Sequence, residues 1–149
     1  MFSTDVLWVI AWKAMSGATL GLVQYVVVRT DLMPSLAWPV GAVIAQACHA
    51  STAVTHLYHD DQNMQRYLAD LDNMHKVVLG IESETKLRNL SEKLTEAVID
   101  HKLWIEQPED TPTCLVTKPY PKEEVSRLFK KLKLFKMDNP SSSRGNTSN

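Results

Sequence analysis

One helical stripe carries the side chains best suited to chemistry. From Pro39 to about His59 the residues are mostly apolar and small, and positions 42, 46, 49, 53 and 56 recur in steps of three and four, which places them on one face of a helix. This face presents Gln46 and His49. An imidazole, with an ordinary pKa of about 6.5, can act as a general base that activates water at neutral pH. The stripe therefore predicts either such a site or a histidine held by hydrogen bonds in the interior.

Other reactive side chains near the stripe are poorly placed for nucleophilic catalysis or for metal binding. Cys48 adjoins His49, but neighbouring residues of a helix point about 100° apart, which disfavours a thiol–imidazole pair. His56 and His59 with Asp60 have ligand-like spacing, yet no further Cys or His lies near them in the sequence. The five glycines form neither a dinucleotide-binding motif nor a P-loop. We therefore expect no metal and no cofactor.

The elements that must position the stripe follow from length and periodicity. A chain of 149 residues with 44% hydrophobic residues has the size of one domain. Strand patterns occupy residues 22–28, 75–81, 100–106 and 113–117. Helix patterns occupy residues 39–59, 62–71, 82–98 and 121–132, the third with Ser83 as its N-cap. The order of elements predicts a three-layer α/β fold, with a mixed sheet of about four strands flanked by helices.

Both ends of the chain differ from the middle. Residues 1–21 are expected to be a poorly ordered N-terminal extension, residues 22–136 the folded domain and residues 137–149 a disordered tail rich in Ser and Asn. The apolar run at residues 6–12 is far shorter than the ~20 residues of a spanning helix, so no membrane partner is expected. A signal peptide and a mitochondrial presequence are alternatives for this end. With only two cysteines, reduced thiols and a cytoplasmic location are expected, with a mitochondrial location as the alternative.

Charge is unevenly distributed along the chain. The net charge is −1, but residues 1–117 hold 8 basic against 14 acidic residues, whereas residues 118–136 hold 7 against 2. Such a basic segment can contact the phosphates of an RNA stem, because backbone contacts need charge rather than sequence. Its alternative role is a solvated amphipathic helix whose cations complement the C-terminal dipole. The cations expected to bind tRNA are Lys118, Lys122, Arg127, Lys130, Lys131 and Lys133.

Several ordered blocks of the sequence match a known family. They are YVVVRTDL at 25–32, WPVGAVIAQACHA at 38–50, HKVVL at 75–79, DHKLWIEQPE at 100–109, PYPKEEV at 119–125 and LFK at 134–136. Together they resemble the type II peptidyl-tRNA hydrolase family over roughly residues 22–136, and most closely its peptidyl-tRNA hydrolase domain-containing branch. The resemblance implies an α/β esterase that cleaves the bond joining a peptide to the 3′ end of tRNA. Peptidyl-tRNA is thus the expected partner; no DNA partner is expected, and a homodimer is left open.

The resemblance also assigns roles to residues. Gln46 and His49 match the family's Q-x-x-H, so His49 is expected to take a proton from water and the Gln46 amide to stabilise the ester oxyanion. Glu106 or Gln107 is expected to help hold the imidazole, with Glu109 as an alternative carboxylate for this role. Two positions depart from the family pattern, because Ala42 replaces a lysine and Gln107 stands where the family has an aspartate.

These departures keep other functions open. Ala42 and Gln107 favour, as the alternative to hydrolysis, a catalytically degenerate member that binds tRNA or a protein partner. An interaction adaptor without RNA contact is a third reading. Activity towards an N-blocked aminoacyl-tRNA separates the first reading from the other two.

Overall fold

The computed structural model describes residues 21–137. Its strands are β1 (Leu22–Arg29), β2 (Lys76–Ile81), β3 (His101–Glu106), β4 (Thr111–Thr117), β5 (Tyr120–Pro121) and β6 (Lys133–Leu134). Its helices are α2 (Val40–Leu57), α3 (Gln62–Leu68), α4 (Glu84–Glu96) and α5 (Lys122–Phe129), with a 3₁₀ turn at Leu71–Asn73. The expected extension at 1–21 and tail at 137–149 fall almost wholly outside the described residues.

The sheet is mixed and centres on β1. Its strand order is β3-β4-β1-β2-β6, with β5 paired to the start of β1. Strand β1 runs parallel to β2, and the remaining pairs are antiparallel. All eight residues of β1 are buried, as expected for a β-branched strand that is covered on both faces.

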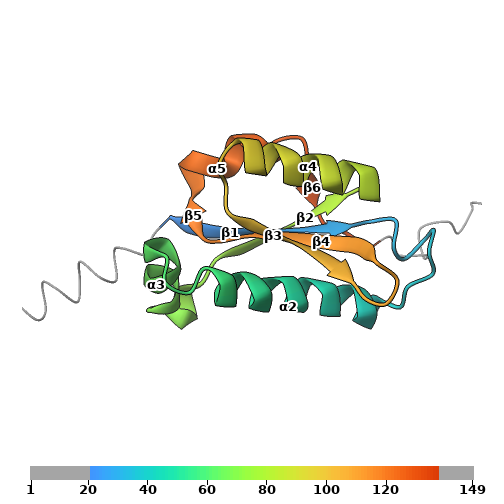
Figure 1. The fold of residues 1–149 in the computed structure, drawn as a ribbon, viewed down its shortest axis with the longest axis horizontal. Helices are drawn as coiled ribbons and strands as arrows, with labels where there is room; N and C mark the ends of the chain where they lie inside the picture. The colour runs from blue at the N-terminus through green and yellow to red at the C-terminus, as the bar shows by residue number, and fades with distance from the viewer. Residues whose placement is uncertain (1–20, 138–149) are drawn as a thin grey trace, which may run out of the picture.

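Two cores form on the two faces of the sheet because successive residues of a strand point to opposite sides. Val23 and Val27 of β1 pack into a cluster with the leucines of α4 and the inner face of α5. Val26 and Val28 pack into a second cluster with α2 and α3. Figure 1 shows α4 and α5 above the sheet and α2 and α3 below it. This arrangement confirms the predicted three-layer α/β fold.

The structure contains the predicted elements and adds two short strands. Each of the four predicted strands and four predicted helices is present, and Ser83 caps α4 by accepting a hydrogen bond from the backbone of Lys86. The sheet has six strands rather than about four, because β5 and β6 contribute two residues each. Two residues are too few to produce a periodic pattern.

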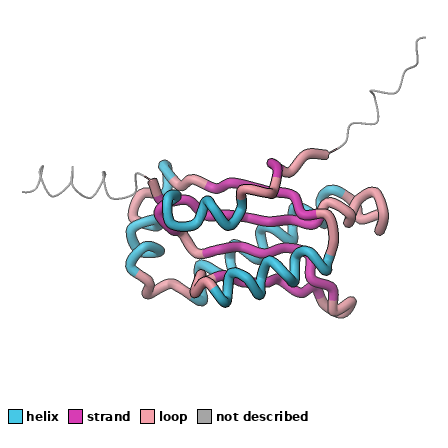
Figure 2. The backbone as a smooth tube through the Cα atoms, turned by 90° about the horizontal axis from the view of Figure 1, so that it is seen from above, coloured by secondary structure: helices cyan, strands magenta, loops and turns pink. Residues whose placement is uncertain are grey.

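The described chain begins and ends at opposite ends of the sheet, as the view from above in Figure 2 shows. No helix between residues 21 and 137 is both long enough and apolar enough to cross a membrane.

Candidate active site

Helix α2 directs two of the predicted catalytic side chains, Gln46 and His49, at the β3–β4 hairpin. The helix starts directly after Pro39, whose φ of −65° suits the entry into a helix. Gln46 is buried against β4 and only 2% exposed. His49, nearly one turn further on, is exposed at the surface and lies against Trp104 of β3. The stripe read from the sequence therefore brings the two side chains to one side of the helix.

A β-bulge brings Thr113 to Gln46. Trp104 pairs with Cys114, whereas the next residue, Ile105, pairs with Pro112, so Thr113 is an extra residue on β4. By simple alternation Thr113 would point away from α2, because Cys114 packs in the cluster on the α2 side. The bulge instead lets the Thr113 hydroxyl donate a hydrogen bond to Gln46 Oε1 at 2.8 Å, and Thr113 is fully buried. This bond fixes the orientation of the Gln46 amide.

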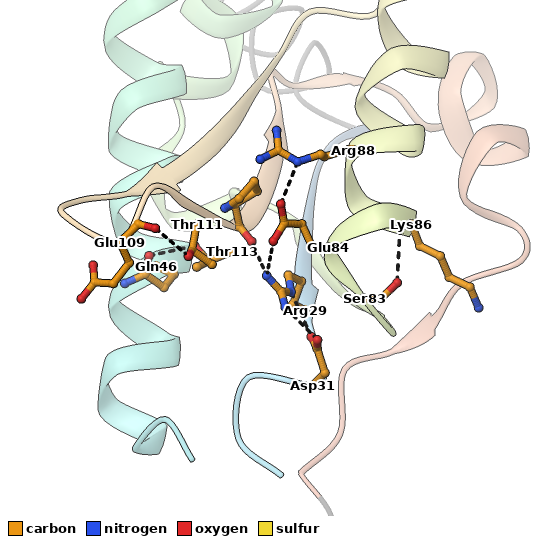
Figure 3. A network of polar contacts seen from close by, with 11 residues as sticks. Arg29, Asp31, Gln46, Ser83, Glu84, Lys86, Arg88, Glu109, Thr111 and Thr113 are labelled. Carbon is orange, nitrogen blue, oxygen red and sulfur yellow. Dashed lines mark hydrogen bonds and ion pairs between the residues drawn. The ribbon is translucent and has the colours of Figure 1, made fainter. Parts of the chain in front are cut away.

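Arg29 supports the bulge from the end of β1. Its guanidinium binds Asp31 through two bonds, Nε to Oδ1 at 2.9 Å and Nη2 to Oδ2 at 2.7 Å. Nη1 donates to the carbonyl of Pro112 at 2.9 Å and lies 3.4 Å from Glu84 Oε2. Figure 3 shows this network beside the Gln46–Thr113 pair. Because Arg29 is only 5% exposed, its charge is balanced by these partners rather than by water.

An aromatic contact holds His49. The rings of His49 and Trp104 are stacked, with centroids 5.1 Å apart and planes inclined by 22°. Trp104 Nε1 in turn donates a hydrogen bond to Glu106 Oε2 at 2.9 Å. Trp104 and Glu106 are two residues apart on β3, which places them on the same face. The carboxylate therefore orients the indole, and the indole supports the imidazole.

Glu106 and Gln107, which were both expected to help hold the imidazole, lie in different surroundings. Glu106 ends β3 and reaches the His49 side through Trp104. Gln107 lies in the exposed turn after β3, where its amide donates to Asp110 Oδ1 at 3.4 Å. Among residues 21–137 neither side chain hydrogen-bonds directly to His49.

The basic segment lies in another layer from Gln46 and His49. Helix α5 packs with α4 on the face of the sheet opposite α2, and β6 forms the edge beside β2. Five of the six predicted cations are exposed: Lys122, Arg127, Lys130, Lys131 and Lys133. The structure therefore does not bring these cations together with the α2 stripe.

Lys118 differs from the other five cations. Its ammonium group lies 2.5 Å from Asp61 Oδ2 and 3.0 Å from Asp100 Oδ2, and its side chain is 11% exposed. Burial disfavours the charged lysine, but the hydrogen bonds to the two carboxylates outweigh burial, so the pKa of Lys118 is raised. Two aspartates already pair with Lys118, unlike the other five cations, and binding of tRNA phosphate by Lys118 stays a prediction.

The Asp61–Lys118 pair should make stability depend on pH. Burial raises the pKa of Asp61, but bonds from Lys118 and from the backbone at the start of α3 outweigh it, so the pKa lies below its ordinary value. A lowered carboxyl pKa adds stability above the unfolded pKa of about 3.9, and this stability is lost as pH falls through the folded pKa. Asp61→Asn, which retains an N-cap, should cost about 2 kcal/mol at pH 7. Urea unfolding at pH 7 and pH 3 checks this; a difference between the two proteins that does not shrink at pH 3 would contradict it.

Two residues of the site were not among the predicted ones. Thr113 was predicted only as part of a strand, and Trp104 only as part of a strand and of a matching block. The signal for Thr113 was Pro112, since proline inside a strand is confined to edges and bulges. The signal for Trp104 was its two-residue spacing from Glu106, which puts both on one face of a strand.

The described part of the chain contains neither a cluster of metal-ligand side chains nor a cysteine that faces His49. Between residues 21 and 137 no three His, Cys, Asp or Glu side chains gather so that they could hold a metal ion. Cys48 and His49 lie on different flanks of α2, since Cys48 faces β1 and β2 and His49 faces β3. Cys114 is buried, which raises the pKa of its thiol to about 12.

The chain combines an α/β fold with a glutamine and a histidine presented by helix α2, which follows β1. Residues 22–135 match the family described as Peptidyl-tRNA hydrolase PTH2, and the chain belongs to this family. The family match confirms the resemblance read from the sequence blocks.

Two relatives are identical to this chain at about half of the aligned positions. The mouse protein named "Putative peptidyl-tRNA hydrolase PTRHD1" is 53% identical over 116 residues, which cover 77% of this chain and 83% of the mouse protein. The human protein of the same name is 51% identical over 116 residues, with the same coverage.

Proposed function

We propose that this protein hydrolyses the ester bond of peptidyl-tRNA, releasing the peptide and free tRNA. The observation that carries the proposal is the pairing, on one side of α2, of a buried amide fixed by Thr113 with an imidazole supported by Trp104. Membership of the peptidyl-tRNA hydrolase family supports the substrate class. Residues 22–136 form the proposed catalytic domain.

His49 serves as the general base in this proposal. It takes a proton from water, the resulting hydroxide attacks the ester carbonyl, and the tetrahedral intermediate collapses with the tRNA ribose oxygen as leaving group. The imidazolium then returns its proton to that oxygen, so the products are a free acid and a tRNA hydroxyl. Glu106 is a positioning residue that acts through Trp104, at 2.9 Å from Nε1, rather than on the imidazole itself.

Gln46 is proposed to stabilise the oxyanion. Its Oε1 accepts from Thr113, so the NH₂ end of the amide is the end that can donate to a substrate oxygen. Ala42, one turn earlier on the helix, adds no cation at this point. The Gln46 amide must therefore stabilise the oxyanion without the lysine that other members of the family carry at this position. Gln107, in the turn after β3, has no catalytic role in this proposal.

Gln46→Leu tests the assignment of the oxyanion donor. Leucine fills a similar volume without an amide, so we expect kcat for an N-acetyl-aminoacyl-tRNA to fall by roughly 10²- to 10³-fold, as when one oxyanion donor is lost. KM should change little, because the interaction forms in the transition state. Thr113→Val is the companion variant, in which the amide remains but loses its fixed orientation. An unchanged kcat in Gln46→Leu would remove Gln46 from the mechanism.

The exposed cations of α5 and β6 are proposed to hold the tRNA stem. Each phosphate neutralised adds about −0.7 to −0.9 to the slope of log K against log salt. Lys130→Gln combined with Lys131→Gln should therefore make that slope shallower by about 1.5. Lys93→Gln on α4, an exposed lysine in the same layer but outside the basic segment, is the control. Equal slopes for the double variant and the wild type would place the tRNA elsewhere.

A further inference from the structure

A groove of about 470 Å³ lies on the flank of α2 that faces away from His49. Its floor is formed by Val26 and Val28 of β1 and Val78 of β2, and its rim by Ile44 and Cys48 of α2. Apart from Lys76 at one end, the lining is almost entirely apolar or small. Helix α2 packs mainly over β3, β4 and β1, and Tyr67 of α3 contacts β2 at Lys76, the first residue of that strand.

The groove leaves apolar side chains in water. Ile44 is 57% exposed and Val78 39% exposed, although both border the groove. Neighbouring exposed apolar residues of this kind mark surfaces that receive an apolar partner. A volume near 470 Å³ lies within the roughly 300–1,000 Å³ of pockets that enclose a ligand. The groove is therefore large enough for several apolar side chains of a docked segment.

We propose that the groove is covered by the apolar run Val6-Leu7-Trp8-Val9-Ile10-Ala11-Trp12 of the same chain. In the sequence this run precedes β1 by nine residues, and Val26 and Val28 of β1 line the groove. Its seven side chains are all apolar and include two tryptophans, which bury large areas. The other end of the chain is a poor occupant, because the thirteen residues from Met137 onward contain no large apolar residue except that methionine.

The chain is long enough to reach the groove. Lys76 pairs with Gln24 near the start of β1, so the Lys76 end of the groove lies close to where the described chain begins. The far end lies at Phe135, whose backbone donates to the carbonyl of Val78. From Leu22 to Val28 the strand covers roughly 20 Å at about 3.3 Å per residue. Residues 13–21 can span up to about 30 Å when extended, which suffices to return the run along the strand.

Cys48 provides a direct readout of whether the groove is covered. It is exposed in the structure of residues 21–137 and borders the groove, whereas the only other cysteine, Cys114, is buried. In the full chain we expect iodoacetamide to alkylate Cys48 at least tenfold more slowly than in Leu7→Asp combined with Ile10→Asp, which charges the run. Ser3→Asp combined with Thr19→Asp adds the same charge outside the run and should react like the wild type.

Three outcomes would overturn the proposal. Equal alkylation rates in the wild type and the Leu7/Ile10 variant would show that the run does not cover the groove. Protection that increases with protein concentration would show that a second copy covers it. A photoreactive benzoylphenylalanine at position 8 that cross-links only outside the groove, located by mass spectrometry in monomeric protein, would place the run elsewhere. None of these outcomes depends on hydrolytic activity, so the proposal stands or fails separately from the proposed function.

Discussion

Replacing His49 by alanine is expected to lower kcat for an N-acetyl-aminoacyl-tRNA by about 10²- to 10⁴-fold, the usual contribution of a general base. The imidazole is exposed and supported by stacking on Trp104, so it can meet a water molecule beside a bound ester. Because His49 is at the surface of α2, its loss leaves the core intact, and the unfolding midpoint should stay close to that of the wild type. Single-turnover release of the N-acetyl-amino acid measures the effect on chemistry alone.

His56→Ala is the matched control for this experiment. It removes an exposed histidine from the same helix two turns further on, and α2 ends one residue later. Its hydrolysis rate should equal that of the wild type. A rate that falls equally in both variants would mean that helix α2 tolerates neither change, and an unaffected rate in His49→Ala would refute the role of His49.

Loss of Arg29 is expected to have the largest effect on folding. In Arg29→Ala the half-buried carboxylate of Asp31 and the buried carbonyl of Pro112 lose their donors. Removing one partner of such a pair typically costs about 3–5 kcal/mol, because the other charge is left unpaired. At about 4 °C per kcal/mol, Tm should fall by roughly 12–20 °C, which calorimetry or thermal circular dichroism would detect.

Arg88→Ala provides the comparison for Arg29. Arg88 also binds Glu84, at 2.8 Å, but both side chains are substantially exposed. Such a surface pair contributes about 0.5 kcal/mol or less, so the variant should unfold close to the wild type. If Arg29→Ala were as mild as Arg88→Ala, the network at Pro112 would not be what holds the bulge.

The main elements of the fold could be predicted because each is long enough to show a period. The apolar run of β1 and the three- and four-residue spacing of α2 and α4 reflect burial that the sequence pattern records directly. The two-residue strands β5 and β6 are defined by pairing with β1 and β2, which are distant in the sequence, and no local pattern records such pairing.

Only those site residues that lie on a single helix could be predicted to face the same way. Gln46 and His49 lie on one face because of helical geometry alone, so their shared direction could be read from spacing. Thr113 could not be placed in this way, because the bulge reverses its direction relative to strand alternation.

The ion pairs of Lys118 could not be predicted from the sequence for a related reason. Its neighbours in the sequence are basic, but its partners Asp61 and Asp100 come from distant segments that only the folded chain brings together. A charge count along the sequence cannot detect pairing of this kind, whereas the other five cations remain exposed as the count suggested.

The most direct test of the central claim is the release of N-acetyl-amino acid from N-acetyl-aminoacyl-tRNA by the wild-type chain, measured alongside tRNA binding at two salt concentrations. The proposed site predicts ester cleavage that saturates with tRNA and leaves the tRNA intact and deacylated. Binding of the tRNA without release of the amino acid, at enzyme concentrations above the dissociation constant, would contradict hydrolysis at His49.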